Sequence, residues 1–420
     1  MILLKNGTYI DWQTHAFTET DLLIGEGPGG KVMFVKGEQG HAGQPVIDCT
    51  GKYIIRSFAN GHHHAYSALA TGMPSPSAAP RDFREILQSV WWKLDKALDQ
   101  EMIRSSALVT AMACARNGVT FVIDHHSSPH SVPGSLEMIA QAFDRVGVSH
   151  LLCYEISDRD GPGAAKEGFE ETCRYLNGNQ GLVGLHASFT IGDETLTKAV
   201  ELAESAGSGI HIHAAEDRFD QEDCMNRYGK RVIERLSQAG ILGLSKSILA
   251  HCLHLSQGER EILSGSKAWI AENMESNLNN GVGFFRLKGL GSNIFLGTDG
   301  MHSDMMKSTK AAYFGGKHLD TPDPGEAYRR LRNVHHYIEK NAFTGDCPNN
   351  LIVFDYNPPT PFHQDNFLGH FFFGMDSGDI LHVISDGKLI FRERTLMTVD
   401  EGEILSEAKI QAARLWKKMQ

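Results

Sequence analysis

The hydrophobic pattern of the chain alternates between two kinds of segment. Segments with helical periodicity, several of them ending in a glycine that suits a helix C-terminus, separate short β-rich runs. Eight such runs occur, and each ends in polar, often histidine-containing, residues; they lie at 53–64, 119–126, 149–157, 181–189, 209–216, 247–255, 268–276 and 293–300. Strand followed by helix, repeated eight times, predicts an α/β fold of the (β/α)8 TIM-barrel class.

The two ends of the chain carry strand-like pieces that do not follow this rhythm. Short apolar pieces separated by Gly and Pro precede residue 53, and strands resume at 350–361 and 380–393 after the turn-rich stretch "FTGDCPNN". We expect the two ends to pair into one small β-sandwich domain, residues 1–56 and 349–420. The barrel would then be residues 57–348, with its site at the C-terminal ends of the strands.

Composition and charge narrow the class of protein. With 41% hydrophobic and 22% charged residues in 420, the chain is typical of a soluble protein with a large core, and no apolar run is long enough for a membrane span. The first residues lack a basic leader, so we expect a cytoplasmic location. A net charge of -11 without a Lys/Arg cluster disfavours nucleic acid and anionic membranes as partners. A small-molecule substrate is favoured, and a homo-oligomer remains open.

Cysteines are not expected to hold the site together. The seven cysteines are odd in number and lack C-x-x-C spacing, which argues against a disulfide framework and against a thiolate zinc site. We expect reduced and mostly buried thiols.

Three consecutive histidines end the first β-rich run, in "NGHHHAY". Side chains alternate along a strand, so His62 and His64 share a face and His63 points away. Two imidazoles alone do not hold a metal securely, and satisfied polar histidines at a strand end are an equally good interpretation of this motif taken by itself. Later runs favour a metal site over this alternative, because two of them carry His213 and Asp299 at their ends. Three imidazoles and a carboxylate at one barrel mouth suit Zn²⁺, with Fe²⁺ as an alternative.

The order N-x-H-x-H, H-x-x-E, A-H and G-T-D-G, together with "GVTFVIDHHSSP", "LHASFT" and "HIHAAED", resembles the amidohydrolase superfamily. The likeness is to its cytosine deaminase, guanine deaminase and triazine hydrolase branch, and within it to the SsnA-type aminohydrolases. It covers nearly the whole chain. The resemblance implies four metal ligands: His62, His64, His213 and Asp299.

The same resemblance implies that Glu216 and His251 are catalytic groups beside the metal. A bound metal ion makes hydroxide available near neutral pH. Asp299 can ligate the ion and accept the proton of the attacking water, while Glu216 can protonate a ring nitrogen or the departing amine. His251 can orient the hydroxide or stabilise an oxyanion. Binuclear relatives carry a lysine at the end of the fourth strand, where this chain reads "GLHASFT", so one metal ion is favoured.

Three further residues are candidates for substrate binding, each with a structural alternative. His186 resembles a substrate-side histidine of the family, or it holds a neighbouring loop. Trp92 can form a wall for a flat heterocycle, or it is a buried aromatic residue. Arg159 can bind a carbonyl or carboxylate, or it pairs on the surface with Asp158 or Asp160.

Other histidines are expected to play supporting parts. His211 shares a face with His213 one layer deeper, which favours a core or supporting position over ligation. His125 and His126 end the second run, where lining the pocket and a satisfied loop histidine are equally good interpretations.

Two departures from the family pattern concern the substrate. Arg56-Ser57 replaces the usual Pro-Gly, and "ENMESN" replaces a histidine-containing sequence at the seventh strand end. We expect Glu272, Met274 and Glu275 to alter the mouth of the pocket.

The sequence thus predicts a metal-dependent aminohydrolase that removes an exocyclic amine from a purine, pyrimidine or pterin ring and releases ammonia. Hydrolytic opening of a cyclic amide or ureide ring is the alternative enzyme reaction. A non-catalytic metal-binding relative is a third hypothesis, and the presence of Glu216, His251 and Asp299 speaks against it.

Overall fold

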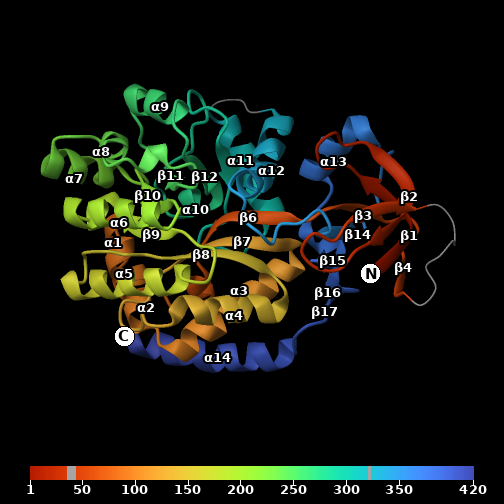
Figure 1. Ribbon diagram of the computed structural model, residues 1–420, viewed down its shortest axis with the longest axis horizontal. Helices are drawn as coiled ribbons and strands as arrows, with labels where there is room; N and C mark the ends of the chain where they lie inside the picture. The colour runs from red at the N-terminus through yellow and green to blue at the C-terminus, as the bar shows by residue number, and fades with distance from the viewer. Residues whose placement is uncertain (36–43, 320–322) are drawn as a thin grey trace.

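A closed barrel of parallel strands forms the centre of the molecule (Figure 1). The computed structural model describes residues 1–35, 44–319 and 323–420. Each barrel strand falls within one of the eight runs that the sequence predicts, so the TIM-barrel prediction is confirmed. In chain order the barrel strands are β6 (Phe58–His63), β7 (Val119–His126), β8 (Ser149–Tyr154), β9 (Val183–Ala187), β10 (Ile210–Ala214), β11 (Ile248–His251), β12 (Trp269–Glu272) and β13 (Ile294–Leu296).

Hydrogen-bonded ladders run from β6 through β7 to β8, and from β9 in chain order to β13. Isolated parallel bridges close the two seams between these two sheets. One bridge pairs Ile156 with Leu185, and another pairs His63 with Asp299. The second bridge sets the start of the barrel directly beside its end. The histidine motif of β6 therefore lies next to the "GTDG" motif that follows β13.

Helices cover the outside of the barrel (Figure 1). Local signals explain where several of them begin and end: the Asp99 carboxylate accepts from the Met102 N–H at the start of α3, and Gly147, at φ 91°, ends α4. The helices are α1 (Phe83–Ile86), α2 (Trp92–Ala97), α3 (Gln100–Arg116), α4 (Ser135–Val146), α5 (Pro162–Leu176), α6 (Asp193–Ser205), α7 (Arg218–Tyr228), α8 (Val232–Gln238), α9 (Gln257–Ser264), α10 (Met274–Asn279), α11 (Met305–Lys317) and α12 (Pro324–Lys340).

An aromatic core fills the barrel below the strand ends that carry the histidines. Phe121, Trp269, Phe295 and Tyr337 are all buried there among small and branched apolar side chains. The Phe295 ring lies so close to β6 that a Cβ on Gly61 would stand 2.4 Å from it. Glycine at this position of the "NGHHH" motif is therefore required by packing.

The two ends of the chain meet in one β domain beside the barrel, as predicted (Figure 1). Its strands belong to a single continuous sheet, ordered β17-β16-β15-β14-β5-β1-β2-β3 with β4 on β1, where the sequence suggested the two layers of a sandwich. Buried Leu4, Leu22, Ile54, Val353 and Ile384 form a separate core in it. The strands are β1 (Ile2–Ile10), β2 (Phe17–Ile24), β3 (Val32–Val35), β4 (Val46–Asp48), β5 (Tyr53–Arg56), β14 (Leu351–Phe354), β15 (Ile380–Ser385), β16 (Lys388–Arg392) and β17 (Thr395–Leu396).

The last helix, α14 (Glu401–Lys418), lies along the barrel rather than on this sheet (Figure 1). The Trp416 indole donates to the Leu69 carbonyl at 2.9 Å, and Arg414 and Lys418 both pair with Asp99. Helix α13 (Phe367–Phe373) joins β14 to β15. The predicted limits of the two domains stay a prediction. Helix α14 falls within the segment assigned to the terminal domain, but its contacts are with the barrel. Within the described ranges, no helix is both long and apolar enough to cross a bilayer.

Candidate metal centre and pocket

Four imidazoles and one carboxylate converge at the mouth of the barrel. His62 and His64 come from the end of β6, His213 from β10, His251 from the end of β11, and Asp299 from the turn after β13. His251 and Asp299 have left-handed backbones, with φ of 73° and 52°. Such conformations are costly for residues other than glycine and gather at functional sites.

The distances between these side chains suit the ligands of a small cation. His64 Nε2 lies 3.1 Å from His213 Nε2 and 3.0 Å from Asp299 Oδ1, and His62 Nε2 lies 3.5 Å from the same oxygen. Ligand bonds of about 2.0–2.1 Å in a tetrahedron separate donor atoms by roughly 3.4 Å. The structure therefore brings together all four residues that the resemblance implied as ligands.

His251 also belongs to this cluster. Its ring, with His62, His213 and Asp299, offers atoms that all lie within 4.8 Å of one another. Its Nε2 is 3.6 Å from Glu216 Oε2 and 3.9 Å from Asp299 Oδ2. The residue expected beside the metal is thus close enough to act on the same ion or on a water there.

Backbone carbonyls orient two of the imidazoles. His64 Nδ1 donates to the His125 carbonyl at 2.6 Å, and His213 Nδ1 donates to the His186 carbonyl at 2.7 Å. Each ring therefore presents its Nε2 to the cluster, and the two Nε2 atoms face each other. Hydrogen bonds of this kind are the usual means by which proteins set the tautomer of a metal-binding histidine.

Side chains orient the other two imidazoles. His251 Nδ1 is 2.7 Å from Asn277 Oδ1, and His62 Nδ1 is 2.9 Å from His211 Nε2. His211 in turn lies 3.6 Å from Cys153 Sγ through its own Nδ1. His211 is therefore a support for His62, as expected.

The Nε2 atoms of His62 and His251 are buried and have no hydrogen-bond partner. Buried polar nitrogens without a partner are costly, and nitrogen lone pairs beside a carboxylate are what divalent transition metals prefer. The residues present thus fit a divalent ion.

Electrostatics separate the two carboxyl groups of the site. Burial raises the pKa of Asp299, but the imidazoles of His62 and His64 beside it outweigh burial and hold it well below the usual range. Burial, with the nearby Asp299 charge, raises the pKa of Glu216 well above its usual range. The surroundings therefore favour the ionised form of Asp299 and the protonated form of Glu216. Burial lowers the pKa of His251 to about 4, so its ring is neutral.

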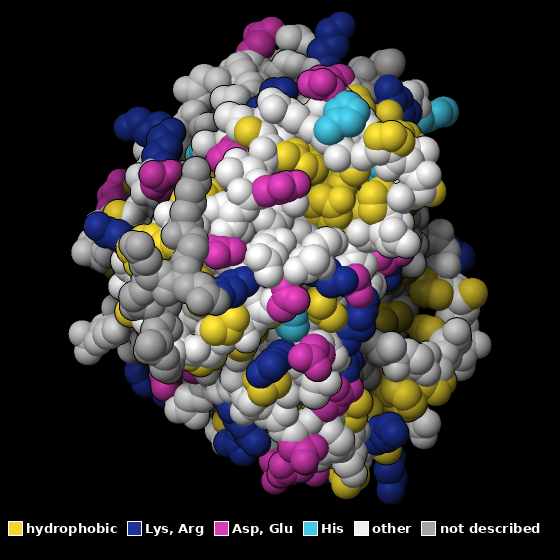
Figure 2. Space-filling view, turned by 90° about the vertical axis from the view of Figure 1, so that its right-hand side faces the viewer, with side chains coloured by type: hydrophobic (Ala, Val, Ile, Leu, Met, Phe, Trp, Pro, Cys, Tyr) yellow, Lys and Arg dark blue, Asp and Glu magenta, His cyan; other side chains and the backbone are white. Residues whose placement is uncertain are grey.

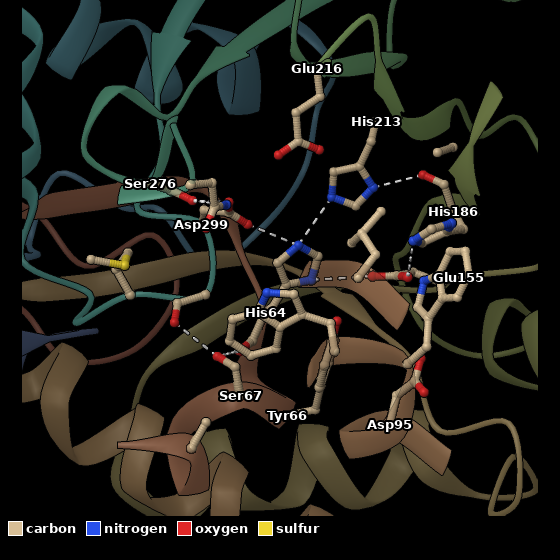
Figure 3. A pocket seen from close by; sticks show the side chains of 18 of the residues that line it. His64, Tyr66, Ser67, Asp95, Glu155, His186, His213, Glu216, Ser276 and Asp299 are labelled. Atoms are coloured by element: carbon tan, nitrogen blue, oxygen red, sulfur yellow. Dashed lines mark hydrogen bonds and ion pairs between the residues drawn. The ribbon is translucent and has the colours of Figure 1, made fainter. Parts of the chain in front are cut away.

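A cavity of about 360 Å³ opens over this cluster (Figure 3). Glu216 and His213 lie above His64 in the view, while Glu155, His186 and Asp95 lie to its right. Aromatic and aliphatic side chains line the rest of the cavity: Phe83, Leu87, Trp91, Trp92 and Phe189. A flat, mostly apolar ligand of small size suits such a lining.

The three candidates for substrate binding all line the cavity. His186 Nδ1 is also 2.8 Å from Thr190 Oγ1, so this residue both faces the cavity and holds a neighbouring turn. Trp92 has a buried indole nitrogen without a partner.

Arg159 is not a surface residue. It pairs with Asp160 at 2.9 Å, which is one of the partners expected from the sequence, and also with the buried Asp95. The other expected partner, Asp158, accepts from the Gly192 N–H instead. The Arg159 guanidinium is therefore buried at the cavity wall.

Sequence reasoning missed two acidic residues of the cavity, Glu155 and Asp95. Glu155 lies 3.2 Å from His64 Nδ1 and 3.5 Å from His125 Nδ1. With His64, His125 and His213 it forms a second group with ligand spacing, which shares His213 with the group of His62, His213, His251 and Asp299. Glu155 directly follows β8, so the rule that polar residues at strand ends face the mouth was the available signal.

The remaining expectations divide. His63 donates to the Asp299 carbonyl at 2.6 Å and lies outside the cavity lining, as expected. The placement of Glu272 near the mouth was wrong, because this carboxylate is buried in an ion pair with Arg330 of α12. Glu275 is not in the cavity lining either, but it pairs at 2.9 Å with His302, which is.

Met274 and the second-strand histidines also lie away from the cavity lining. Met274 is buried close to Gly315 of α11, so the expectation that it alters the mouth was wrong as well. His126 bonds Ser128, whereas both ring nitrogens of His125 are buried without a hydrogen-bond partner.

A barrel with this donor set at its mouth defines a metal-dependent hydrolase. The profile of the Amidohydrolase family matches residues 53–329, and the chain belongs to that family. It is 28% identical to the 5-methylthioadenosine/S-adenosylhomocysteine deaminase of Pelotomaculum thermopropionicum over 94% of this chain and 92% of that protein. It is 27% identical to the 5'-deoxyadenosine deaminase of Methanopyrus kandleri, over 84% and 85%.

Among solved structures, an adenosine deaminase from Xanthomonas campestris with bound zinc superimposes with a TM-score of 0.81 at 17% identity, covering 99% of this chain and 98% of that one. At this identity the likeness bears on the fold. It covers the terminal β domain as well as the barrel.

Proposed function

We propose that this protein is a deaminase that removes an exocyclic amine from an aminated nitrogen heterocycle, of the adenine type in the first instance, and releases ammonia. The observation that carries the proposal is the position of Glu216. This buried carboxyl group, whose pKa lies well above its usual range, stands beside His251 and the ligand cluster at the floor of an aromatic-lined cavity. A carboxylic acid that stays protonated at neutral pH can give a proton to a ring nitrogen. The names of the relatives support the same reaction.

One divalent ion, zinc in preference to iron, would be held by His62, His64, His213 and Asp299. When bound, it supplies a nucleophile at neutral pH by lowering the pKa of a water molecule. The finer placement of the chain among the SsnA-type aminohydrolases is part of this proposal, as are a cytoplasmic location and an assembly of identical chains.

The residues of the chain divide the proton transfers between them. Glu216 protonates the ring nitrogen next to the carbon under attack. Asp299, held ionised, receives the proton of the attacking water and passes it to the departing amine. His251, neutral and fixed by Asn277, orients the water through its free Nε2. Ammonia then leaves, and the proton of the new hydroxyl returns to Glu216 as the carbon becomes a carbonyl.

The cavity walls would hold the ring in the plane that these transfers need. Trp92 and His186 contact the heterocycle, and Arg159 contacts its distal edge. Phe189 and Leu87 exclude water from the reacting face.

Zinc-loaded protein offered a panel of aminated purines, pyrimidines and pterins tests the proposal by assay of ammonia. We expect ammonia in proportion to product for at least one ring class. Product formed by ring opening, without ammonia, contradicts deamination, and a Glu216→Gln variant with unchanged turnover contradicts the assigned proton donor.

A further inference from the structure

Among the residues that the structure describes, the cavity has one arginine or lysine side chain in its lining, Arg159. Four carboxyl groups line the same cavity: Asp95, Glu155, Glu216 and Asp299. Asp299 and Glu216 belong to the metal end. Any anionic group at the other end of a substrate would therefore depend on Arg159 for a counter-charge.

Arg159 already has its counter-charges within the protein. One nitrogen of the guanidinium pairs with Asp95 and another with Asp160 at 2.9 Å, and the plane lies over the Trp92 ring at 5.2 Å. The exposed fractions of the Arg159 and Asp95 side chains are 8% and 2%. The pair is thus built into the wall.

The Asp95 carboxylate can accept a further hydrogen bond. Its Oδ2 also accepts from the Ser127 hydroxyl at 2.9 Å, which fixes its orientation, while its Oδ1 is buried without a hydrogen-bond partner. Glu155 stands on the same side of the cavity, where its Oε1 lies 3.2 Å from His64 Nδ1 (Figure 3). This side of the cavity offers acceptors rather than a spare cation.

We infer that the pocket selects uncharged heterocycles and rejects substrates that carry a phosphate or carboxylate, and that Asp95 sets this selection by neutralising Arg159. The inference rests on the proposed function, and it narrows the substrate class. Placing a like charge beside a buried carboxylate is strongly unfavourable, whereas a hydroxyl or ring N–H can donate to it. The sequence alone left open that Arg159 binds a carboxylate, and in the structure the carboxylate bound to it is Asp95 of the same chain.

Pairs of probes that share a ring and differ in charge test the inference on the zinc-loaded protein. They are adenosine and adenosine 5'-monophosphate, and guanosine and guanosine 5'-monophosphate. We expect kcat/KM for the uncharged member of a nucleoside pair to exceed that for the phosphate by at least about tenfold. Equilibrium dialysis of the same probes gives the selection independently of turnover.

The Asp95→Asn variant keeps the shape of the side chain and one hydrogen-bond acceptor. It removes the negative charge of one of the two carboxylates that pair with Arg159. We expect the ratio of anionic to neutral kcat/KM, and of the two affinities, to rise about tenfold in this variant. The double variant Asp95→Asn/Arg159→Gln should lose that gain. Glu85→Gln is the matched control, because Glu85 pairs with Arg81 outside the cavity lining, and its ratio should equal that of the parent.

The outcomes separate this inference from the proposed function. Equal use or equal binding of neutral and phosphorylated members by the parent protein overturns the inference and leaves deamination standing. An unchanged ratio in Asp95→Asn, with its fold shown intact by circular dichroism, overturns the role of Asp95. Absence of ammonia from every ring class contradicts the proposed function, and the dialysis ratios then decide the charge selection by themselves.

Discussion

The two ends of the barrel differ in how they treat polar groups. At the base, Trp269, Phe295 and Tyr337 pack ring against ring with Phe121 in the same core, and the Tyr337 hydroxyl donates to the Lys246 carbonyl at 2.8 Å. Among these four residues one buried polar atom has no hydrogen-bond partner within the described chain, the Trp269 indole nitrogen. At the mouth, imidazoles and carboxylates are just as deeply buried, and more of their atoms have no partner there, including ring nitrogens of His62 and His251. The unsatisfied atoms are thus concentrated at the end of the barrel that carries the cavity.

The same strands carry residues of both ends, and this explains how the fold tolerates unpaired and strained groups at the mouth. Phe295 lies in β13, and Asp299 follows four residues later with a left-handed backbone. The aromatic packing below holds β13 against Gly61 of β6, while the bridge between His63 and Asp299 holds Asp299 beside His62 and His64. Stability at the base offsets the cost of unpaired and strained groups at the mouth.

The largest effect is expected from Glu216→Gln at the mouth. The variant keeps the shape but loses the proton donor, so kcat/KM should fall about 10²- to 10⁴-fold while zinc content and the melting temperature stay as in the parent. Steady-state kinetics with metal analysis checks this. Glu222→Gln, at an exposed position on α7, is the matched control and should be silent. A variant that loses its zinc would instead make Glu216 a ligand.

Phe295→Ala at the base should act on stability. Removing this fully buried ring should lower the free energy of unfolding by about 3–5 kcal/mol and leave the kcat/KM of the folded molecules within a few-fold. Denaturant titration measures the first and kinetics the second. Phe314→Ala, where half of the side chain is exposed, should change stability by about 0.5 kcal/mol or less. A large loss of activity without loss of stability would show that the two ends do not divide their tasks.

His211→Ala tests the link between the two ends, because His211 supports His62 from below. We expect zinc affinity to fall about 10- to 100-fold, as measured by competition with a chromogenic chelator. The matched control is His150→Ala, a half-buried histidine near the start of β8, which should keep the parent affinity. Unchanged affinity in His211→Ala would mean that His62 is oriented by packing alone.

The smallest effect is expected outside both ends. Asp99→Asn keeps the cap of α3 but loses the charge that Arg414 and Lys418 meet, so unfolding should become easier by about 1 kcal/mol or less. Thermal unfolding at low and high salt checks this, since salt should shrink the difference. A larger loss would show that docking of α14 is a main source of stability.

Much of the fold was predictable because it rests on local signals. The run "VTFVIDHH" is β7 residue for residue, and the polar ends of the runs lie at one mouth, as parallel strands require. The first run is split at Ser57, where β5 belongs to the terminal sheet and β6 to the barrel. Hydrophobic pattern alone does not distinguish two consecutive strands from one long strand.

The walls of the pocket were less predictable, because they depend on partners far apart in the chain. Asp95 and Arg159 are 64 residues apart, and nothing in either neighbourhood announces their pairing. Glu272 appeared to belong to the mouth from its place at a strand end, but Arg330 of α12 holds it outside the lining. Ion pairs of this kind depend on burial and on geometry across elements.

The sequence by itself determined the barrel, its polar mouth and the residue types that can bind a metal ion there. These follow from periodicity and from the chemistry of side chains, which act over a few residues. Only the tertiary structure decided which nitrogen each imidazole presents, that Glu216 is kept from ionising, and that Asp95 neutralises Arg159. Those properties arise from burial and from contacts between distant segments, and burial is a property of the folded chain alone.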